Sequence, residues 1–366
     1  MTARGGRAIL HIGMGKCGSS ALQAALSANP RFGRESGPEA IYLAHDHKLR
    51  LIEGRRLTRQ AETRNAGHAN GATTLDLLDG AVDLDALART IARHRAAGRD
   101  VVLSNEGWAR HAGRFAERRF VERVAPGAEI VVSVRPQVEW LNSAWWQWGA
   151  WSDRPFDRWM RRQRDLGSYD WHATVEAWKT VPGVAAIRVM PASFDVVGAF
   201  RRATGLPLVG GPRSNRTAPA VLLRLMQLHP DLRPGAGADF LYARHLPTLK
   251  GKAPWVIDPS LAAEVIAETT AGNRALLPLM TDIDAAAVAA DARWWDAAAF
   301  ADRTPEPADP VPPDPAALEA LAHAALLSLS AVDRQVLKPL RAIEASLPPA
   351  LGERLRTWLA RLRAGW

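Results

Sequence analysis

Cysteine and long apolar runs are almost absent from this sequence, and each absence excludes a class of protein. Cys17 is the only cysteine among 366 residues, so no internal disulfide can form and we expect a reducing compartment, the cytoplasm. No window holds about 18 uninterrupted apolar residues, so we expect no membrane span. The N-terminal stretch "MTARGGRAILHIGMG" has no sustained apolar core, and a secretory signal is therefore not expected.

Acidic residues are outnumbered by basic ones. The 47 lysines and arginines against 38 acidic residues give a formal charge of +9 and a pI of about 10.3. Such a surface suits an anionic ligand, although an arginine- and alanine-rich composition alone gives the same balance. No basic patch interleaved with aromatics forms a known nucleic-acid module, so no nucleic-acid partner is expected. The length and the hydrophobic content of 47% are enough for one large domain or two modest ones.

Short apolar strand patterns alternate with helical patterns along much of the chain. The strand patterns occur at residues 7–13, 100–108, 128–136 and 185–191. A helical pattern follows each of them, and a further one at 83–98 precedes the second. This alternation predicts an α/β fold with a parallel sheet. Residues 31–80 have few periodic signals, and we expect loops and short helices there.

The C-terminal part is mainly helical from residue 217. Residues 304–315, "TPEPADPVPPDP", predict a proline-rich linker between a domain at 1–303 and amphipathic helices at 316–366. The last helical pattern has an apolar face flanked by arginines, and such a helix can pack on its own domain, pair with another subunit or lie on an anionic membrane. We expect packing, with peripheral membrane contact left open. The oligomeric state is not indicated.

The stretch "ILHIGMGKCGSS", residues 9–20, predicts an anion-binding loop. An apolar strand enters a glycine-rich turn, and the helical pattern "ALQAAL" follows. This order surrounds an anion with backbone N–H groups at the positive end of a helix. The loop residues that we expect to bind the anion are Gly15, Lys16, Cys17, Gly18, Ser19 and Ser20.

Several chemistries use loops of this kind, and the residues weigh against three of them. A kinase or ATPase loop places lysine after the last glycine and needs a second-strand aspartate for Mg²⁺, whereas the strand at 100–108 offers Glu106. A cysteine phosphatase would need an arginine six positions after Cys17, where Gln23 stands. The glycines fit the spacing of a dinucleotide-binding loop, but no acidic residue ends a strand about 20 residues later.

The segment "HIGMGKCGSSALQ" resembles the 5′-phosphosulfate loop of sulfotransferases that use 3′-phosphoadenosine-5′-phosphosulfate (PAPS), and is closest to bacterial and Golgi-type carbohydrate-modifying members. Cysteine and serines replace the threonines of that loop. The resemblance implies a three-layer, P-loop-like α/β fold with a central parallel sheet and helical C-terminal elements. It also implies sulfuryl transfer from PAPS without a metal, with Lys16 stabilising the leaving phosphate.

The family's 3′-phosphate site is matched by "IVVSVRPQVEWLNSAWWQ". Arg135 ends a predicted strand and Ser143 follows eight residues later, as in that site. An arginine fork suits a terminal phosphate, and a serine two helical turns along can face the same ligand. A further segment, "GPRSNRTAPAVLLRLM", resembles the one that closes the cofactor site in bacterial members, which implies cofactor contacts from Arg213 and Asn215.

Two residues are proposed for the base that deprotonates the acceptor. Glu106 lies at the end of a predicted strand, in the layer where Lys16 is expected, and matches a glutamate that bacterial members often carry; it could instead cap a helix. His68, in "GHANGATTL", resembles a histidine-bearing segment of related enzymes. His11 is expected to position the loop. His45 and His47 lack a third ligand nearby, so no metal site is expected.

The acceptor is not identified by any motif. Carbohydrate is the first expectation, and a small metabolite or a lipid head group the second. Five tryptophans in "WLNSAWWQWGAW" are expected to pack in the core, with an aromatic platform for a sugar ring as the alternative. A nucleotide kinase, or a non-catalytic protein that binds an anion or nucleic acid on the same fold, remains the alternative function.

Overall fold

The computed structural model describes residues 5–33, 39–63, 67–192, 195–210, 218–233, 235, 242, 245–339 and 353. The chain divides into two compact units. Unit 1 contains residues 1–216 and 254–309, and unit 2 contains residues 217–253 and 310–366. This division differs from the one expected at residues 303–316, because the segment 217–253 groups with the C-terminal helices and not with the sheet.

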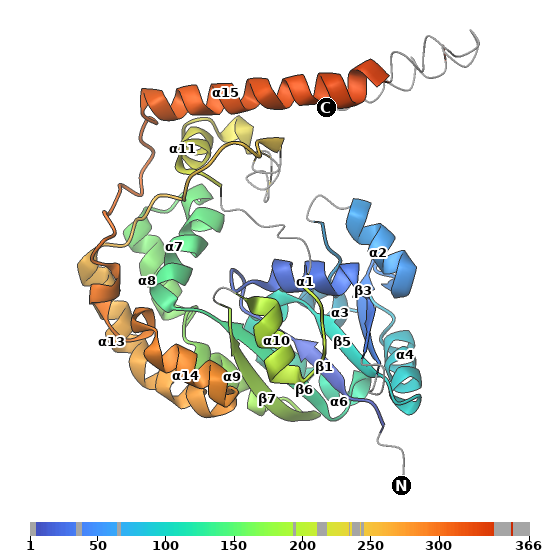
Figure 1. The fold of residues 1–366 in the computed structure, drawn as a ribbon. Helices are drawn as coiled ribbons and strands as arrows, with labels where there is room; N and C mark the ends of the chain where they lie inside the picture. The colour runs from blue at the N-terminus through green and yellow to red at the C-terminus, as the bar shows by residue number, and fades with distance from the viewer. Residues whose placement is uncertain are drawn as a thin grey trace. The chain divides into compact units, whose positions relative to one another are not determined.

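Unit 1 is built on a mostly parallel sheet (Figure 1). Its strands lie in the order β2 (Arg31–Phe32), β3 (Ala40–His45), β5 (Asp100–Ser104), β1 (Ala8–His11), β6 (Ala128–Val134) and β7 (Val184–Pro191), and β4 (Leu51–Ile52) pairs with β3. Strands β3, β5, β1, β6 and β7 are parallel neighbours, whereas β2 and β4 run antiparallel to β3. The predicted α/β fold with a parallel sheet is confirmed.

The strand β3 corrects one expectation. Residues 31–80 were expected to form loops and short helices, but they contain this fully buried strand, two short antiparallel strands and the helices α2 (Gly54–Thr63) and α3 (Thr74–Leu78). The run "AIYLAH" is short and lacks alternation because both of its faces are covered. Its ladder partner β5 lies far along the sequence, so no local pattern marks it.

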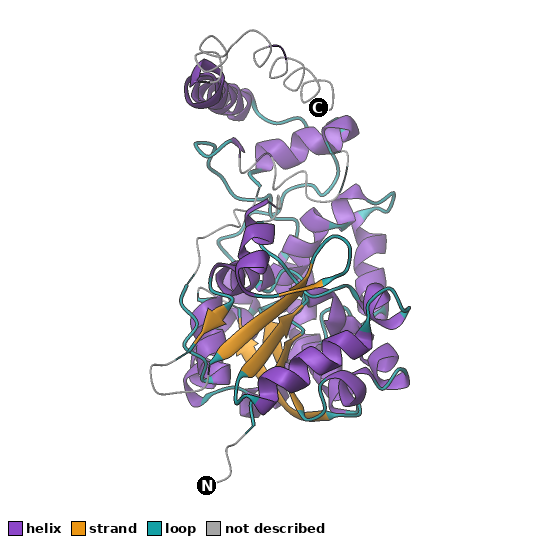
Figure 2. Cartoon of the chain, turned by 90° about the vertical axis from the view of Figure 1, so that its right-hand side faces the viewer, coloured by secondary structure: helices purple, strands orange, loops and turns teal. Residues whose placement is uncertain are grey.

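Helices lie on both sides of the strands of unit 1 (Figure 2). They are α1 (Ser19–Ala28), α4 (Leu84–Ala96), α5 (Ala112–Glu117), α6 (Phe120–Val124), α7 (Gln137–Gln147), α8 (Phe156–Asp165), α9 (Trp171–Lys179), α10 (Val196–Thr204), α13 (Pro259–Leu276) and α14 (Asp282–Ala290), together with α2 and α3. Aspartate side chains accept a backbone N–H at the start of several of them, for example Asp83 before α4 and Asp170 before α9. Such caps satisfy donors that the helix itself leaves open.

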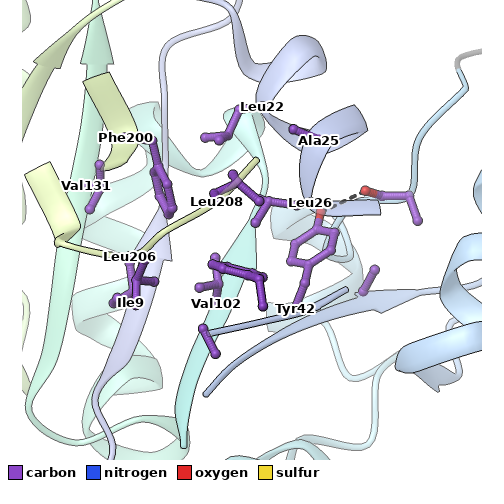
Figure 3. Packing of buried hydrophobic residues seen from close by; sticks show 14 of the residues in the cluster. Ile9, Leu22, Ala25, Leu26, Tyr42, Val102, Val131, Phe200, Leu206 and Leu208 are labelled. Carbon is purple, nitrogen blue, oxygen red and sulfur yellow. Dashed lines mark hydrogen bonds between the residues drawn. The ribbon is translucent and has the colours of Figure 1, made fainter. Parts of the chain in front are cut away.

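The core beside the predicted loop lies between the sheet and the helices α1 and α10. Leu22 and Leu26 of α1 and Phe200 of α10 pack with strand residues such as Ile9 and Val102 (Figure 3). These side chains are fully buried, and truncating a leucine in such a core costs about 2–5 kcal/mol. This packing fixes the first turn of α1 over the carboxyl end of β1.

Unit 2 is helical in the part that the structure describes. It contains α11 (Ala220–Leu228), a short 3₁₀ turn (Pro230–Leu232) and α15 (Pro315–Val332), which continues as a π-helical turn (Asp333–Leu337). By length and composition alone, Pro315–Gln335 could cross a membrane. Core helices of soluble proteins pass the same test, so this property is weak evidence of a span.

Candidate functional site

The loop between β1 and α1 is a tight turn with a lysine in an unusual conformation. The Cys17 N–H donates to the Met14 carbonyl at 3.0 Å, and the Met14 N–H donates to the Ser133 carbonyl of β6 at 3.3 Å. Lys16 has φ +65°, the sign that a type II turn requires at its third position and that usually selects glycine or asparagine. A lysine in this conformation is disfavoured, so the surrounding contacts must hold it there.

Glycine is required at two positions of the loop. Gly18 has φ +78° immediately before α1, and a Cβ there would lie 3.0 Å from Val196 of α10. A Cβ on Gly13 would lie 2.2 Å from the Ser133 hydroxyl and 2.7 Å from a ring nitrogen of His11. The glycine spacing seen in the sequence therefore has a steric cause on both sides of the turn.

The start of α1 offers unused hydrogen-bond donors. The N–H groups of Gly18, Ser19 and Ser20 donate to no acceptor among the described residues. The Ser19 hydroxyl is buried and forms no hydrogen bond within that same part of the chain. Free N–H groups and the positive helix end favour a bound anion, and a buried hydroxyl without a partner needs one.

The loop carbonyls are held by side chains from β6 and α7. Trp140 donates its indole N–H to the Gly15 carbonyl at 2.6 Å, and Arg135 Nη1 donates to the Lys16 carbonyl at 3.1 Å. Trp171 in turn donates to the Arg135 carbonyl at 2.9 Å. These contacts stabilise the turn and occupy the carbonyl groups of Gly15 and Lys16.

One face of α7 is directed at the loop. Glu139 accepts from Arg135 Nη2 at 3.0 Å, and Gln147 accepts from Lys16 Nζ at 3.3 Å. Ser143 stands four residues from each of them, and residues four apart share a helix face. The predicted cofactor residue Ser143 is thus placed on the face that meets Lys16 and Arg135. Neither Glu139 nor Gln147 was predicted, although their spacing from Ser143 could have indicated them.

The Arg135 guanidinium has acceptors for some of its nitrogens and an open position at another. Besides the Lys16 carbonyl it contacts Glu139, which also accepts from Arg293 Nη1 at 3.2 Å. Its Nε is buried and has no acceptor among the residues that the structure describes. A guanidinium with one nitrogen left without an acceptor can still receive an anionic oxygen.

Glu106 begins a short 3₁₀ helix (Glu106–His111) directly after β5. Asn105 caps this helix, because its side chain accepts the Gly107 N–H at 2.7 Å. The alternative of Glu106 as the cap is therefore wrong. Its Oε2 is buried and lacks a hydrogen-bond partner in the described parts of the chain. The strand ends at Ser104, so Glu106 lies just beyond the predicted strand end.

Burial raises the pKa of the Glu106 carboxyl above its ordinary value. The nearby charge of Lys16 and the Ser19 hydroxyl lower it by less, and Ser19 is close without forming a hydrogen bond of good geometry. The carboxyl therefore lies near both the loop lysine and the first turn of α1. A carboxylate with a raised pKa is a better proton acceptor than an ordinary glutamate.

His11 links three strands beneath the loop. One ring nitrogen bonds the Ser104 hydroxyl at 2.8 Å and the other bonds the Ser133 hydroxyl at 2.9 Å, while Gln23 of α1 donates to Ser104 at 3.1 Å. Complete burial lowers the pKa of His11 to about 3, so the ring is neutral. The histidine positions the loop, as the sequence suggested, and its pKa excludes it as a cationic anion ligand.

Cys17 is fully buried in the loop. Burial raises the pKa of its thiol to about 12, although the nearby cations Arg135 and Lys16 act in the opposite direction. A thiol that stays protonated is not a nucleophile. This strengthens the sequence argument against a cysteine phosphatase, and leaves the Cys17 backbone as its contribution to the loop.

Three predicted residues, His68, Arg213 and Asn215, are not among the contacts of the loop described above. His68 is half-buried in a segment that is tied to β3 and β5, where Tyr42 donates to the Ala69 carbonyl at 2.7 Å and the Gly71 N–H donates to Ser104 at 2.8 Å. The predicted cofactor residues Arg213 and Asn215 lie outside the described residues. Within the described chain, no group of three or more His, Cys, Asp or Glu side chains is arranged to bind a metal.

The tryptophan-rich segment divides into buried and exposed members. Trp140, Trp145 and Trp146 are buried, as core packing predicts. Trp148 is 48% exposed, and its ring lies over Gly15, where a Cβ would be 3.0 Å from the indole. An exposed aromatic face therefore lies beside the turn that contains Gly15 and Lys16.

Comparisons with known proteins give a distant likeness. No protein-family model matches the sequence, and no curated protein sequence matches it. Among solved structures, a crystal structure of a sulfotransferase from Alicyclobacillus acidocaldarius is similar to this chain. The two share 14% identity and a TM-score of 0.38, over 74% of this chain and 94% of that chain. So distant a likeness shows neither family nor activity, and the functional conclusion rests on the residues of the loop.

Proposed function

We propose that this protein is a sulfotransferase that moves a sulfuryl group from PAPS to an acceptor hydroxyl. One observation carries the proposal. Among the described residues, Glu106 has a buried carboxylate oxygen, Oε2, without a hydrogen-bond partner, and its carboxyl lies close to Lys16 and Ser19 at the start of α1. The other open groups, the Ser19 hydroxyl and Arg135 Nε, fit a doubly anionic ligand.

Each residue has a role in the proposed reaction. The donor supplies an activated sulfuryl group on a phosphate leaving group. The N–H groups of Gly18, Ser19 and Ser20 bind the phosphosulfate, and Lys16 balances the charge that develops on the leaving phosphate. Glu106 accepts the proton of the acceptor hydroxyl while that oxygen forms the new bond to sulfur. His68 is the second candidate for this base.

The 3′-phosphate is assigned to Arg135 and Ser143. Arg135 already pairs with Glu139 at 3.0 Å, so the phosphate has to share or replace this partner. Glu139 keeps a second cation in Arg293, at 3.2 Å, and is not left without a charge partner when Arg135 turns to the ligand. We therefore expect that, when the nucleotide binds, Arg135 exchanges Glu139 for the 3′-phosphate, while the Glu139 carboxylate keeps its ion pair with Arg293.

The acceptor is proposed to be a carbohydrate or another ring-bearing hydroxyl compound. Trp148 supports this choice, because it presents an exposed indole beside Gly15. Aromatic faces of this kind stack on the apolar face of a sugar ring. Action in the cytoplasm follows from the cysteine content and belongs to the same proposal.

Calorimetry with 3′,5′-adenosine bisphosphate, the product nucleotide, tests the donor. We expect binding of this nucleotide and no Mg²⁺-dependent binding of ATP. Binding of ATP with Mg²⁺ and none of the bisphosphate would favour the nucleotide kinase instead. Binding of neither would leave the loop as an anion site without this chemistry and refute the proposal.

Arg135→Ala tests the assignment of the 3′-phosphate. Affinity for 3′,5′-adenosine bisphosphate should fall by about tenfold or more, the loss expected for a charged hydrogen bond, while affinity for 5′-AMP hardly changes. Arg188→Ala is the matched control, since it removes the same charge from an exposed position on the neighbouring strand β7. An equal loss in both variants would show a general charge effect and not recognition by Arg135.

A further inference from the structure

The helix α15 of unit 2 exposes large apolar side chains along its length. Leu326 and Leu329 are 64% and 67% exposed, and Leu318, Leu327 and Val332 are exposed as well. Among its described residues, only Ala324 is buried. Exposed apolar residues are ordinary when they are scattered, but a series of them on one helix marks an interaction surface.

The apolar surface covers most of the circumference of α15. At 100° per residue, Leu321 and Ser328 lie on the side that packs towards α11, and Leu318, Leu329 and Val332 form an exposed stripe next to that side. Glu319, His323 and Ser330 group on the opposite side. The exposed stripe and the polar side thus lie on different sides of the helix, and a helix divided in this way can lie along a membrane interface.

A groove between α11 and α15 extends this surface. It has a volume of about 630 Å³, and its lining includes Leu222, Met226, Leu321 and Leu329. Because both walls are apolar, the exposed stripe of α15 and the groove form one continuous apolar region within unit 2.

The charge of unit 2 selects the kind of partner. Its sequence contains 12 lysines and arginines against 7 acidic residues, a net charge of +5, more than half of the +9 of the whole chain. Six of these basic residues follow α15, from Lys338 onward. A second copy of the chain would bring the same positive charge, whereas an anionic lipid surface brings the opposite one.

We propose that α15 binds the surface of an anionic lipid bilayer, lying along the interface with its exposed stripe among the acyl chains. The helix keeps its contacts with α11, and the Ser328 hydroxyl donates to the carbonyl of His245, in the segment between the two helices, at 2.5 Å. It therefore lies on the membrane and does not cross it.

Vesicle flotation of the full-length chain tests this inference. The chain should float with phosphatidylcholine vesicles that contain phosphatidylglycerol, bind pure phosphatidylcholine vesicles at least about tenfold less, and lose binding at high salt. The double variant Leu318→Glu/Leu329→Glu, which changes two residues of the exposed stripe, should reduce binding by about tenfold or more. Ile283→Glu in unit 1 is the matched control, since Ile283 is 68% exposed, and it should bind like the unchanged chain. No flotation, or full binding by the double variant, would overturn the inference.

Single labelled cysteines give a second measurement that does not depend on the glutamate variant. Cys17 is fully buried, so a cysteine placed at Leu329 or at His323 can be labelled selectively with an environment-sensitive dye. Vesicles should shift the dye emission to the blue at position 329 and leave it nearly unchanged at position 323. Equal shifts at both positions, or a shift that follows chain concentration without lipid, would overturn the inference, the second in favour of self-association.

Discussion

Replacing Lys16 by glycine should separate stability from catalysis in this protein. Lys16 is one of three described residues other than glycine that have a positive φ, at +65°. An L-residue in the left-handed region costs about 1–2 kcal/mol. Glycine relieves this strain and removes the ammonium group that we assign to the leaving phosphate.

The expected change in folding free energy follows from three contributions. Relief of strain adds about 1–2 kcal/mol to the free energy of unfolding. The greater freedom of glycine in the unfolded chain takes back about 0.5–1 kcal/mol. Loss of the bond from Lys16 Nζ to Gln147, which is long at 3.3 Å and half-buried, removes about 0.5 kcal/mol. Lys16→Gly should therefore change the free energy of unfolding by an amount between about −0.5 and +1 kcal/mol.

The same variant should lose about a hundredfold or more in sulfuryl transfer, since a charged hydrogen bond made mainly in the transition state contributes about 3 kcal/mol. Transfer can be followed without a known acceptor, as release of 3′,5′-adenosine bisphosphate from PAPS in water. Arg119→Gly is the control, because Arg119 also has a positive φ, at +47°, on an exposed surface. It should leave the melting temperature close to that of the unchanged chain, because relief of strain is offset by loss of the ion pair with Glu122, and it should keep the rate. A Lys16→Gly variant destabilised by more than about 1 kcal/mol, beyond the range of these contributions, or one with normal turnover, would refute the reasoning.

Three further predictions concern protonation and the base. Glu106→Gln should lower kcat by about 10²–10⁴ and keep nucleotide affinity. In the unchanged chain the pKa of the Glu106 carboxyl is raised, so the acid limb of the pH–rate profile should lie at a higher pH than an ordinary glutamate would give. A rate that is lost in His68→Ala but kept in Glu106→Gln would assign the base to His68. The pKa of His11 is about 3 in the folded chain and about 6.5 in the unfolded chain, so between pH 6.5 and pH 3 only the unfolded chain binds this proton. The free energy of unfolding should therefore fall by about 1.4 kcal/mol for each pH unit of acidification over this range. Chemical denaturation of His11→Asn over that range should give a flatter profile, and an unchanged slope contradicts the assignment. With its pKa near 12, Cys17 should resist a thiol reagent at neutral pH until the chain is unfolded, and fast labelling of the folded chain would contradict its burial.

The parallel sheet could be predicted because its central strands carry their own pattern. The runs that form β1, β5, β6 and β7 are short, apolar and bounded by polar or glycine residues. The strand β3 is equally buried but lies in a region where the sequence shows few periodic signals, and its pairing with β5 is a long-range contact. The grouping of α11 with α15 was missed for the same reason, since a helix pattern shows that an apolar face exists and does not show what covers it.

Some residues of the candidate site could likewise be predicted from the sequence, and others could not. The loop could be predicted from the sequence because backbone geometry and steric contact require glycine at positions 13 and 18. Glu139 and Gln147 were not predicted. Their four-residue spacing from Ser143 is a signal in the sequence, but a charged or amide side chain on a helix is usually solvated, so their contacts become evident only when α7 is placed against the loop. Asn105 shows a third case. The sequence indicated a helix cap at this point with Glu106 as the candidate, but the side chain of Asn105 provides the cap.

The indole of Trp140 has a consequence for how fast a ligand can bind. In a trans peptide the N–H points opposite to the carbonyl, so a donor fixed on the Gly15 carbonyl also fixes the direction of the Lys16 N–H. Arg135 fixes the next peptide unit through the Lys16 carbonyl. Folding has therefore already ordered the turn, and little conformational entropy remains to be lost on binding. We expect association of an anion with this loop to follow single-step kinetics, without a slow phase for loop closure.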